Sequence, residues 1–288
     1  MVTVGVVSPG HMGSALGQVL AAGGARVVTT IEGRSRRTRR LAAQAGLKTL
    51  DDLDAVVSTS DVVLSVTPPA AAVDNAVAVA SAALRTRATP LVADLNAVSP
   101  ATMRTVGEVL RRAGLELVDG AISGAPPSIR PGALLYFSGR RAKRVVDLPW
   151  TNVRPRVVAN TVGSASALKM CTASVYKGLT ALCAHAMLTA QHHGVLEPVV
   201  TDLTEGLGFD PAYRVALAAS KSRRFVPEMR EISGTQGAAG LTPDLFTAMA
   251  QVYEMLTHSE LADASPETVT SSLSAAEVVA RLAPGRGR

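Results

Sequence analysis

The sequence predicts a doubly wound α/β domain over residues 1–160, followed by an all-helical domain over residues 161–288. Up to about residue 160, short runs rich in β-branched residues alternate with amphipathic helical stretches, and after that point only helical patterns follow one another. Strands that are apolar on both faces and separated by helices are typical of a parallel sheet with right-handed crossovers.

The elements of the first domain follow one another in a regular order. An apolar strand at 2–8 leads into a helix from about His11 to Ala22, and a second strand follows at 25–31. Further strands are predicted at 61–67, 90–95 and 115–120, each preceded by a helical segment, and another at 133–139 at an edge of the sheet.

The second domain consists of helices joined by short turns. The helices are predicted over 163–193, 197–206, 211–236 and 242–260. The turns "GFDP" and "GLTP" separate them, with Asp210 and Thr242 placed to cap the helices that follow. The tail "APGRGR" is expected to be disordered.

The composition narrows the class of partner. The chain has 24 arginines, five lysines and a net charge of +6, but its arginines are spread over several segments and only 3% of its residues are aromatic. Bases would find little to stack on, and no zinc-finger or basic-zipper spacing is present. We therefore expect an anionic small ligand and no nucleic acid.

Several features favour a cytoplasmic protein without a membrane segment. The N-terminus "MVTVGVVSPG" lacks a basic region and contains Pro9 and Gly10, unlike a signal peptide. There is no run of about 18 apolar residues. Cys171 and Cys183 are 12 residues apart in one helical run, which separates their Cα atoms by roughly 18 Å and excludes a disulfide.

The loop after the first strand resembles a dinucleotide-binding loop of a Rossmann-type domain. Such loops have the pattern G-x-G-x-x-G, and this chain has Gly10 and Gly13, with Ser8 in place of the first glycine. The helix that follows would present its N–H groups to the phosphates. The predicted cofactor contacts here are Ser8, Pro9, Gly10, His11, Met12 and Gly13.

The segment after the second strand selects between NAD(H) and NADP(H). It reads "TTIEGRSRRTRR". Glu32 alone would favour NAD(H), by holding a ribose 2′-hydroxyl. Arg34, Ser35, Arg36 and Arg37 place three cations and a hydroxyl where a 2′-phosphate would lie, and arginine binds phosphate through paired hydrogen bonds. The segment therefore favours NADP(H).

Together with later motifs, these loops resemble those of the β-hydroxyacid dehydrogenase superfamily, which includes 6-phosphogluconate dehydrogenase. The family's "NR(S/T)" corresponds to "GRS" from Gly33, its "DxSTxxP" to "DLNAVSP", and its "DAPVSGG" to "DGAISGA". Its lysine signature "GxxxxxKxxxN" corresponds to Gly163 through Ala173. The later "FVPEMREISGTQGAAGL" is similar to a subgroup with a C-terminal domain of unknown function.

The resemblance implies roles for individual residues. Lys169 would be the general acid/base, and Ser123 and Gly124 would hold the substrate's carboxylate or equivalent polar group. Asn96 would lie near the nicotinamide or the substrate. Further cofactor contacts implied or predicted are Gly33, Arg34, Ser35, Arg37, Val66, Thr67 and Pro68.

The chain departs from the family four residues after the lysine, where Ala173 replaces an asparagine that orients the substrate. Thr172 and Tyr176 lie on the same helical face as Lys169 and are candidate substitutes. Lys177 is either a second substrate-binding cation or the partner of a carboxylate. Glu228 and Glu231 are interpreted as solvated carboxylates, and no cluster has metal-ligand spacing.

The predicted activity is that of an NADP(H)-dependent oxidoreductase acting on a small carboxylate-bearing carbonyl compound or a 2- or 3-hydroxy acid. Imine reductases share this architecture and are the alternative, and a non-catalytic nucleotide sensor is a further one. The helix over 163–193 is apolar on nearly every face, which predicts a homodimer through the helical domain. The active site is expected in the cleft between the domains.

Overall fold

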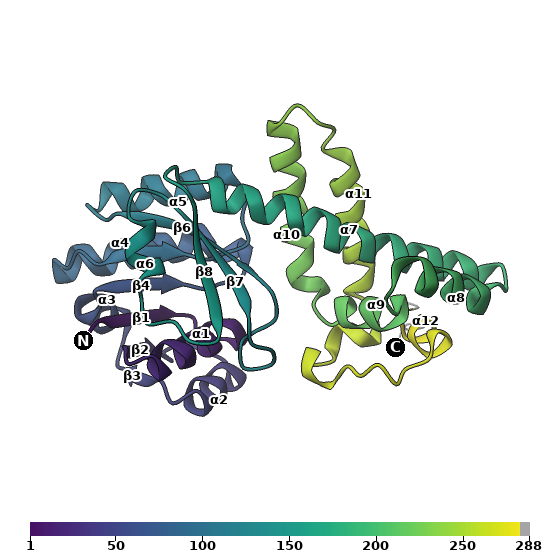
Figure 1. Ribbon diagram of the computed structural model, residues 1–288, viewed down its shortest axis with the longest axis horizontal. Helices are drawn as coiled ribbons and strands as arrows, with labels where there is room; N and C mark the ends of the chain where they lie inside the picture. The colour runs from purple at the N-terminus through teal and green to yellow at the C-terminus, as the bar shows by residue number, and fades with distance from the viewer. Residues whose placement is uncertain (283–288) are drawn as a thin grey trace. The chain divides into compact units, whose positions relative to one another are not determined.

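The computed structural model describes residues 1–282 (Figure 1). Its elements are β1 (Thr3–Val7), α1 (His11–Ala22), β2 (Arg26–Thr30), α2 (Arg36–Gln44), β3 (Lys48–Leu50), α3 (Leu53–Thr59), β4 (Val62–Ser65), η1 (Pro69–Ala71), α4 (Ala72–Thr86), β5 (Leu91–Asp94), α5 (Pro100–Arg112), β6 (Leu117–Ser123), β7 (Ala133–Ser138), α6 (Ala142–Val146), β8 (Val153–Ala159), α7 (Ser164–His192), α8 (Leu196–Leu207), α9 (Pro211–Ala219), α10 (Ser222–Ala238), α11 (Asp244–Leu256), η2 (Glu260–Asp263), η3 (Pro266–Thr268) and α12 (Ala275–Leu282).

The chain divides into two compact units. Unit 1 covers Met1–Met170 and unit 2 begins at Cys171. The boundary lies ten residues beyond the predicted one at residue 160, because the start of α7 is hydrogen-bonded to the sheet of unit 1. The tail predicted to be disordered lies outside the described residues.

Unit 1 is built on one eight-stranded sheet of order β3-β2-β1-β4-β5-β6-β7-β8. All neighbouring strands are parallel except β6 and β7. The order reverses direction between β1 and β4, which is where doubly wound sheets bind ligands. The predicted α/β fold with a helical second part is confirmed.

The prediction that residues 133–139 form an edge strand is wrong. They form β7, which lies between β6 and β8. The edge on this side of the sheet is β8. Its sequence "VRPRVVA" is not predicted as a strand because Pro155 interrupts its pattern. Proline lacks the N–H that a central strand donates, so an edge strand is where it is tolerated.

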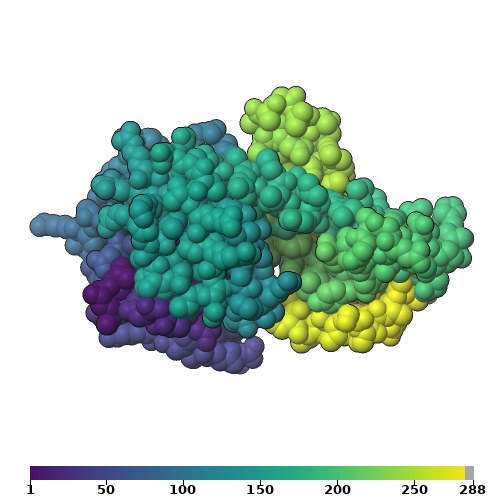
Figure 2. All heavy atoms as spheres, viewed as in Figure 1, coloured from purple at the N-terminus to yellow at the C-terminus, as the bar shows by residue number. Residues whose placement is uncertain are grey.

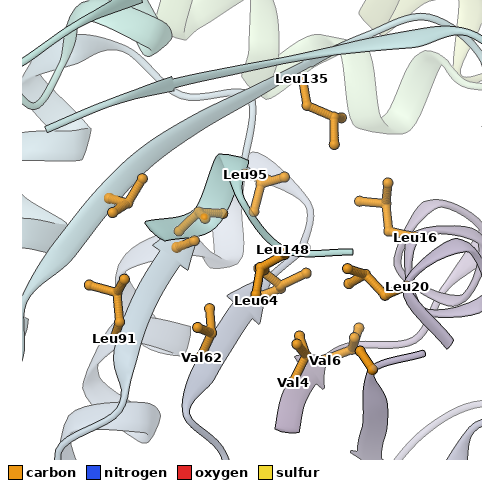
Figure 3. Close-up of a cluster of buried hydrophobic side chains, with 14 of the residues drawn as sticks. Val4, Val6, Leu16, Leu20, Val62, Leu64, Leu91, Leu95, Leu135 and Leu148 are labelled. Atoms are coloured by element: carbon orange, nitrogen blue, oxygen red, sulfur yellow. The ribbon is translucent and has the colours of Figure 1, made fainter. Parts of the chain in front are cut away.

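The two faces of the sheet bury separate apolar clusters. On one face, residues of β1, β4, β5 and β7 pack against α1 and α6, with Leu16, Leu64 and Leu135 fully buried (Figure 3). On the other face, α3, α4 and α5 cover the sheet, and Met103 of α5 and Val63 of β4 belong to the cluster that is buried there. The strands are near-continuously apolar in sequence because both faces of a parallel sheet are buried.

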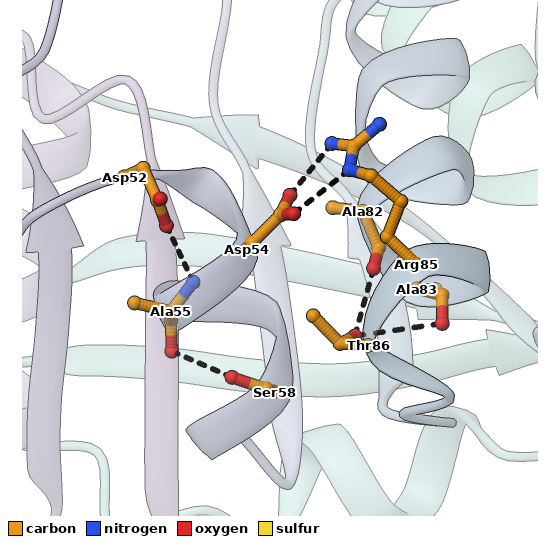
Figure 4. Close-up of polar contacts among 8 residues, drawn as sticks. All are labelled: Asp52, Asp54, Ala55, Ser58, Ala82, Ala83, Arg85 and Thr86. Carbon is orange, nitrogen blue, oxygen red and sulfur yellow. Dashed lines mark hydrogen bonds and ion pairs between the residues drawn. The ribbon is translucent and has the colours of Figure 1, made fainter.

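Polar contacts cap α3 and connect it to α4 on the second face of the sheet. The Asp52 carboxylate caps α3 by accepting the Ala55 N–H at 2.7 Å (Figure 4). Two residues further, Asp54 receives two hydrogen bonds from Arg85 on α4, at 2.8 and 2.6 Å. These contacts join α3 to α4 at the surface.

Unit 2 is helical throughout most of its described residues. The predicted helix at 211–236 is two helices, α9 and α10, and Asp210 caps α9 through the N–H groups of Ala212 and Tyr213. Thr242 accepts the Asp244 N–H at 3.3 Å at the start of α11. The ends of α10 and α11 around residues 234–245 project from this unit as the lime-coloured part of the surface (Figure 2). No helix within residues 1–282 is both long and apolar enough to cross a membrane.

Candidate functional site

The loop between β1 and α1 has the backbone of a dinucleotide-binding turn. Ser8 adopts a left-handed conformation with φ of 66°, which is the conformation that glycine normally supplies. The Gly10 N–H is donated to Ser8 O at 2.8 Å, which closes the turn. A Cβ on Gly13 would lie 2.5 Å from Ser8 O, so the helix can approach the strand only with glycine there.

The mouth of this turn is shaped for an anion. Apart from Gly10 itself and its two chain neighbours, no atom of the described residues lies within 4 Å of where a Cβ on Gly10 would stand. The helix α1 begins at His11 and has no acidic residue in its first turn. A phosphate would meet the positive end of the helix dipole.

The segment after β2 places an arginine at the same edge of the sheet. Arg34 donates its N–H to Ile31 O, and the hydroxyl of Ser35 caps α2 by accepting the Thr38 N–H at 3.2 Å. Arg34 is half-buried, whereas Glu32, Ser35 and Arg37 are exposed. The Nε atom of Arg34 is buried without a hydrogen-bond partner among the described residues.

A polar network joins the ends of β4 and β5. Asn96 is buried, and its Oδ1 accepts the Thr67 N–H at 2.6 Å. Its Nδ2 donates to Ser65 Oγ at 3.0 Å and to Asp94 Oδ2 at 2.9 Å. Asn75 on α4 donates to the same Ser65 oxygen at 2.7 Å. The side chain of Asn96 thus holds the two loops together, and its direct contact with a ligand stays a prediction.

Asp94 is the buried carboxylate of this network. The pKa of its carboxyl is raised to about 7, mainly by burial and in addition by the charge of Asp119 on the next strand, against hydrogen bonds from Asn96 and Ser65 that lower it. Next to this network, the hydroxyl oxygen of Thr67 is buried and has no hydrogen-bond partner within the described residues.

These observations fit a bound dinucleotide. The open turn at Gly10 would accommodate the pyrophosphate. The Arg34 Nε and the Thr67 hydroxyl are buried polar groups whose hydrogen bonds are unmade, a situation that native proteins rarely leave without a ligand or water. Val66 and Pro68 flank Thr67 at the same strand end.

The sequence reasoning missed the residues that fix the start of α7. The Asp119 carboxylate on β6 accepts four hydrogen bonds, from the Gly163 and Ser166 N–H groups and from the Ser166 and Ser138 hydroxyls, at 2.7 to 3.1 Å. Ser138 Oγ in turn accepts the Ala165 N–H. Asp119 therefore caps a helix more than 40 residues away in the sequence. The only available signal was an aspartate at the start of "DGAISGA".

Lys169 lies on α7 about one and a half turns after this cap. Its Nζ donates to Ile122 O on β6 at 2.8 Å, which places the ammonium group at the strand that ends with Ser123. Gly124 follows with φ of 133°, and a Cβ there would lie 3.1 Å from the Ala133 Cα. Unit 1 thus brings Lys169 together with the predicted substrate loop.

The remaining predicted substrate residues lie on α7 within unit 2. Thr172 is half-buried, and Tyr176 is 62% exposed. Lys177 forms an ion pair with Glu228 on α10 and lies 4.3 Å from the centroid of the Phe225 ring. This contact accounts for the burial of Lys177 without a ligand.

The interpretation of Glu228 as a solvated carboxylate is wrong. Its side chain is 3% exposed. The sequence showed only the helical neighbours of Glu228, whereas its partner Lys177 lies on another helix. Within residues 1–282, no three His, Cys, Asp or Glu side chains gather as a metal site would require.

Comparisons with known proteins match both parts of the chain. The NAD binding domain of 6-phosphogluconate dehydrogenase matches residues 3–148. A domain of unknown function, DUF1932, matches residues 190–256. A 28.5 kDa protein in the 7S RNA 5′ region of Methanothermus fervidus is 28% identical over 80% of this chain and 88% of its own.

Solved structures share the architecture. A conserved protein with structural similarity to 3-hydroxyacid dehydrogenases is 27% identical, with a TM-score of 0.65 over 89% of this chain and 97% of its own. The 3-hydroxyisobutyrate dehydrogenase of Mycobacterium tuberculosis has a TM-score of 0.67 at 19% identity, over 93% and 98%. An imine reductase from Myxococcus stipitatus, in complex with NADP⁺, has a TM-score of 0.54 at 21% identity, over 88% and 92%. At these low identities, the last two show the fold alone.

Removing one partner of the buried ion pair is predicted to destabilise unit 2. Lys177→Met leaves the Glu228 carboxylate buried without its cation, and we expect a loss of about 3–5 kcal/mol in the free energy of unfolding. Urea unfolding followed by circular dichroism measures it. The double variant Lys177→Met/Glu228→Leu, which removes both charges, should recover most of that loss. Equal losses in the single and double variants would contradict this account.

Proposed function

The chain belongs to the family defined by the NAD binding domain of 6-phosphogluconate dehydrogenase, and we propose that it is an NADP(H)-dependent oxidoreductase. Its substrate would be a small carbonyl compound that carries a carboxylate, or the corresponding 2- or 3-hydroxy acid. The observation that supports this most strongly is the Lys169 ammonium group, held by Ile122 O at the end of β6 beside Ser123 and Gly124.

The cofactor would be held by residues of unit 1. The turn from Ser8 to Gly13 would bind the pyrophosphate, and Arg34, Ser35 and Arg37 would bind the 2′-phosphate. Arg34 is the most informative of these, because its Nε is buried and without a hydrogen-bond partner in the described part of the chain. A phosphate oxygen would supply that partner through a charge-assisted hydrogen bond.

Lys169 and the residues around it would then carry out the proton transfer. NADPH supplies the hydride when it is bound. The Lys169 ammonium group donates a proton to the carbonyl oxygen as the hydroxyl forms, and its neutral amine accepts that proton in the reverse direction. The Ser123 hydroxyl and the backbone N–H groups that follow it hold the carboxylate. Ile122 O keeps the ammonium group next to this loop.

Reduction of a C=N bond is the second candidate function. Imine reductases share this fold, and a lysine ammonium group can protonate nitrogen as well as oxygen. A nucleotide sensor without turnover is the third. Both cysteines are free thiols, which supports the cytoplasmic location that we propose.

A substrate screen tests the proposed reaction. We expect NADPH oxidation with members of a panel of keto acids and semialdehydes, and none with cyclic imines. In Lys169→Met, turnover should fall 10²- to 10⁴-fold, the usual contribution of a general acid, while NADPH binding by fluorescence is kept. The matched control is Lys143→Met, which changes an exposed lysine of the same unit. Undiminished turnover in Lys169→Met would refute the assigned role, and NADPH binding without any turnover would favour the sensor.

The cofactor preference is tested at Arg34. Arg34→Ala removes the cation proposed to bind the 2′-phosphate, so we expect the Kd for NADPH to rise roughly 10- to 100-fold while the Kd for NADH changes little. Arg40→Ala, an exposed arginine on α2, serves as the control. A wild-type protein that binds NADH more tightly than NADPH would overturn the assignment.

We further propose a homodimer through the helical domain. Val175, Tyr176 and Leu182 on α7 are 64%, 62% and 57% exposed. Leu182 lines an apolar groove of about 330 Å³ between α7 and α11, together with residues such as Leu245 and Met255. A second copy of the chain would cover this surface.

Light scattering after size exclusion should give twice the mass of the chain. Leu182→Glu places a charge in the apolar groove and should shift the mass toward the monomer. Leu84→Glu, which changes a leucine on α4 that is 64% exposed, should not. A wild-type monomer at micromolar concentration would exclude the dimer.

A further inference from the structure

The network at the ends of β4 and β5 contains a carboxylate that the proposed reaction does not use. Asp94 is 1% exposed and sits in register with Ser65 on β4 and with Asp119 on β6. No lysine or arginine pairs with it in the described residues. Its negative charge is met by hydrogen bonds instead.

Every partner of Asp94 is a hydrogen-bond donor. The Asn96 N–H reaches Oδ1 at 2.9 Å, and Asn96 Nδ2 reaches Oδ2 at 2.9 Å. The Ser65 hydroxyl is also hydrogen-bonded to this carboxyl group. The hydroxyl acts as the donor in this bond, because the Ser65 oxygen already accepts from two amides, Asn75 and Asn96. If Asp94 were protonated, its O–H group would point at another hydrogen-bond donor, and at least one of these hydrogen bonds would be lost. The network matches the ionised carboxylate.

The ionised carboxylate determines which way the Asn96 amide points. In the observed orientation, Nδ2 faces Asp94 and Ser65, and Oδ1 faces the Thr67 N–H. The reversed amide would set its oxygen against the carboxylate and its NH₂ against the Thr67 N–H. Both contacts would be repulsive.

Thr67 is the end of this chain of contacts. Its N–H is held by Asn96 at 2.6 Å, and its hydroxyl oxygen is buried without a hydrogen-bond partner among the described residues. In the strand order β2-β1-β4-β5, the adenosine half of a dinucleotide lies toward β2 and the pyrophosphate at the β1–α1 turn. The end of β4, with Thr67, is then left for the nicotinamide half.

On the basis of the proposed NADP(H) function, we propose that Asp94 is a positioning residue for the cofactor. Its carboxylate fixes the Asn96 amide, Asn96 fixes the Thr67 backbone, and the Thr67 hydroxyl is thereby directed to hydrogen-bond the nicotinamide half of the dinucleotide.

The charged surroundings of Asp94 make this arrangement sensitive to pH. Asp119 on β6 is the neighbouring charge and has the same sign, while Ser65 on β4 and Asn75 on α4 are neutral. Burial and Asp119 bring the pKa of Asp94 to about 7. Below that pH, Asp94 takes up a proton, Asn96 is no longer fixed, and NADPH affinity falls. Above it, the affinity is full.

Fluorescence titration with NADPH at pH 8 tests the chain of contacts without knowledge of the substrate. Asp94→Asn and Thr67→Val should each raise the Kd about tenfold, the effect of one lost hydrogen bond to a ligand. Thr67→Ser keeps the hydroxyl and should bind nearly as the wild type does. Asp147→Asn, at an exposed aspartate, is the control and should change nothing.

The pH profile separates positioning from a loss of packing. Between pH 8 and pH 6 the wild-type affinity should fall about fivefold, as a pKa of about 7 and a tenfold weaker neutral form require, beyond the titration of the NADPH 2′-phosphate near pH 6 that all variants share. Asp94→Asn should lack that extra fall. Asn96→Leu, which keeps the volume without the amide, should lack it too, and it tests the proposal if Asp94→Asn does not fold.

The outcomes are distinct from those for the proposed function. Wild-type protein that binds neither NADPH nor NADH refutes the proposed function and this inference with it. Wild-type binding that is matched by Asp94→Asn or by Thr67→Val at pH 8 overturns the inference alone. So does an Asn96→Leu profile identical to that of the wild type.

Discussion

The capping of α7 by Asp119 is the contact on which the arrangement of unit 1 depends. A helix of 29 residues leaves the sheet here, and its first N–H groups have no partner within the helix. Asp119 and Ser138, on adjacent strands, satisfy three of them. Since Lys169 follows on the same rigid helix, the cap determines its height above the sheet, and the bond to Ile122 O then sets its direction.

A second constraint is the row of polar groups that the sheet buries at its carboxyl edge. Ser65, Asp94 and Asp119 occupy equivalent positions on three adjacent strands. Two of them are carboxylates whose pKa values burial raises. Buried charges are costly unless hydrogen bonds surround them, and each carboxylate here is surrounded by donors from the segment it holds. The sheet thus keeps α7 and the loops after β4 and β5 in place by the same means.

The features that the sequence predicted are those that depend on residues close together along the chain. The helix at His11–Ala22 and the apolar strands follow from periodicity, and family motifs made Lys169, Ser123 and the nucleotide loop candidates for the site. What it did not predict depends on contacts distant along the chain. Asp119 acts on Gly163 and Ser166, and Glu228 pairs with Lys177 from a different helix. The strand β8 was missed because Pro155 is tolerated only at an edge, and the sheet order decides which strand is the edge.

The serine at the start of the nucleotide loop has a consequence for how that loop would receive its ligand. What the turn requires at position 8 is a torsion angle, and Ser8 supplies it at a cost of roughly 1–2 kcal/mol that a glycine would avoid. A serine also has fewer conformations available to it in the unfolded chain than a glycine does, so less entropy is lost when the turn is ordered. That gain, about 0.4–1 kcal/mol, is smaller than the cost of the torsion angle, so the shape of the turn must be held by its surroundings, which are the Gly10 N–H bond to Ser8 O and the close approach of Gly13.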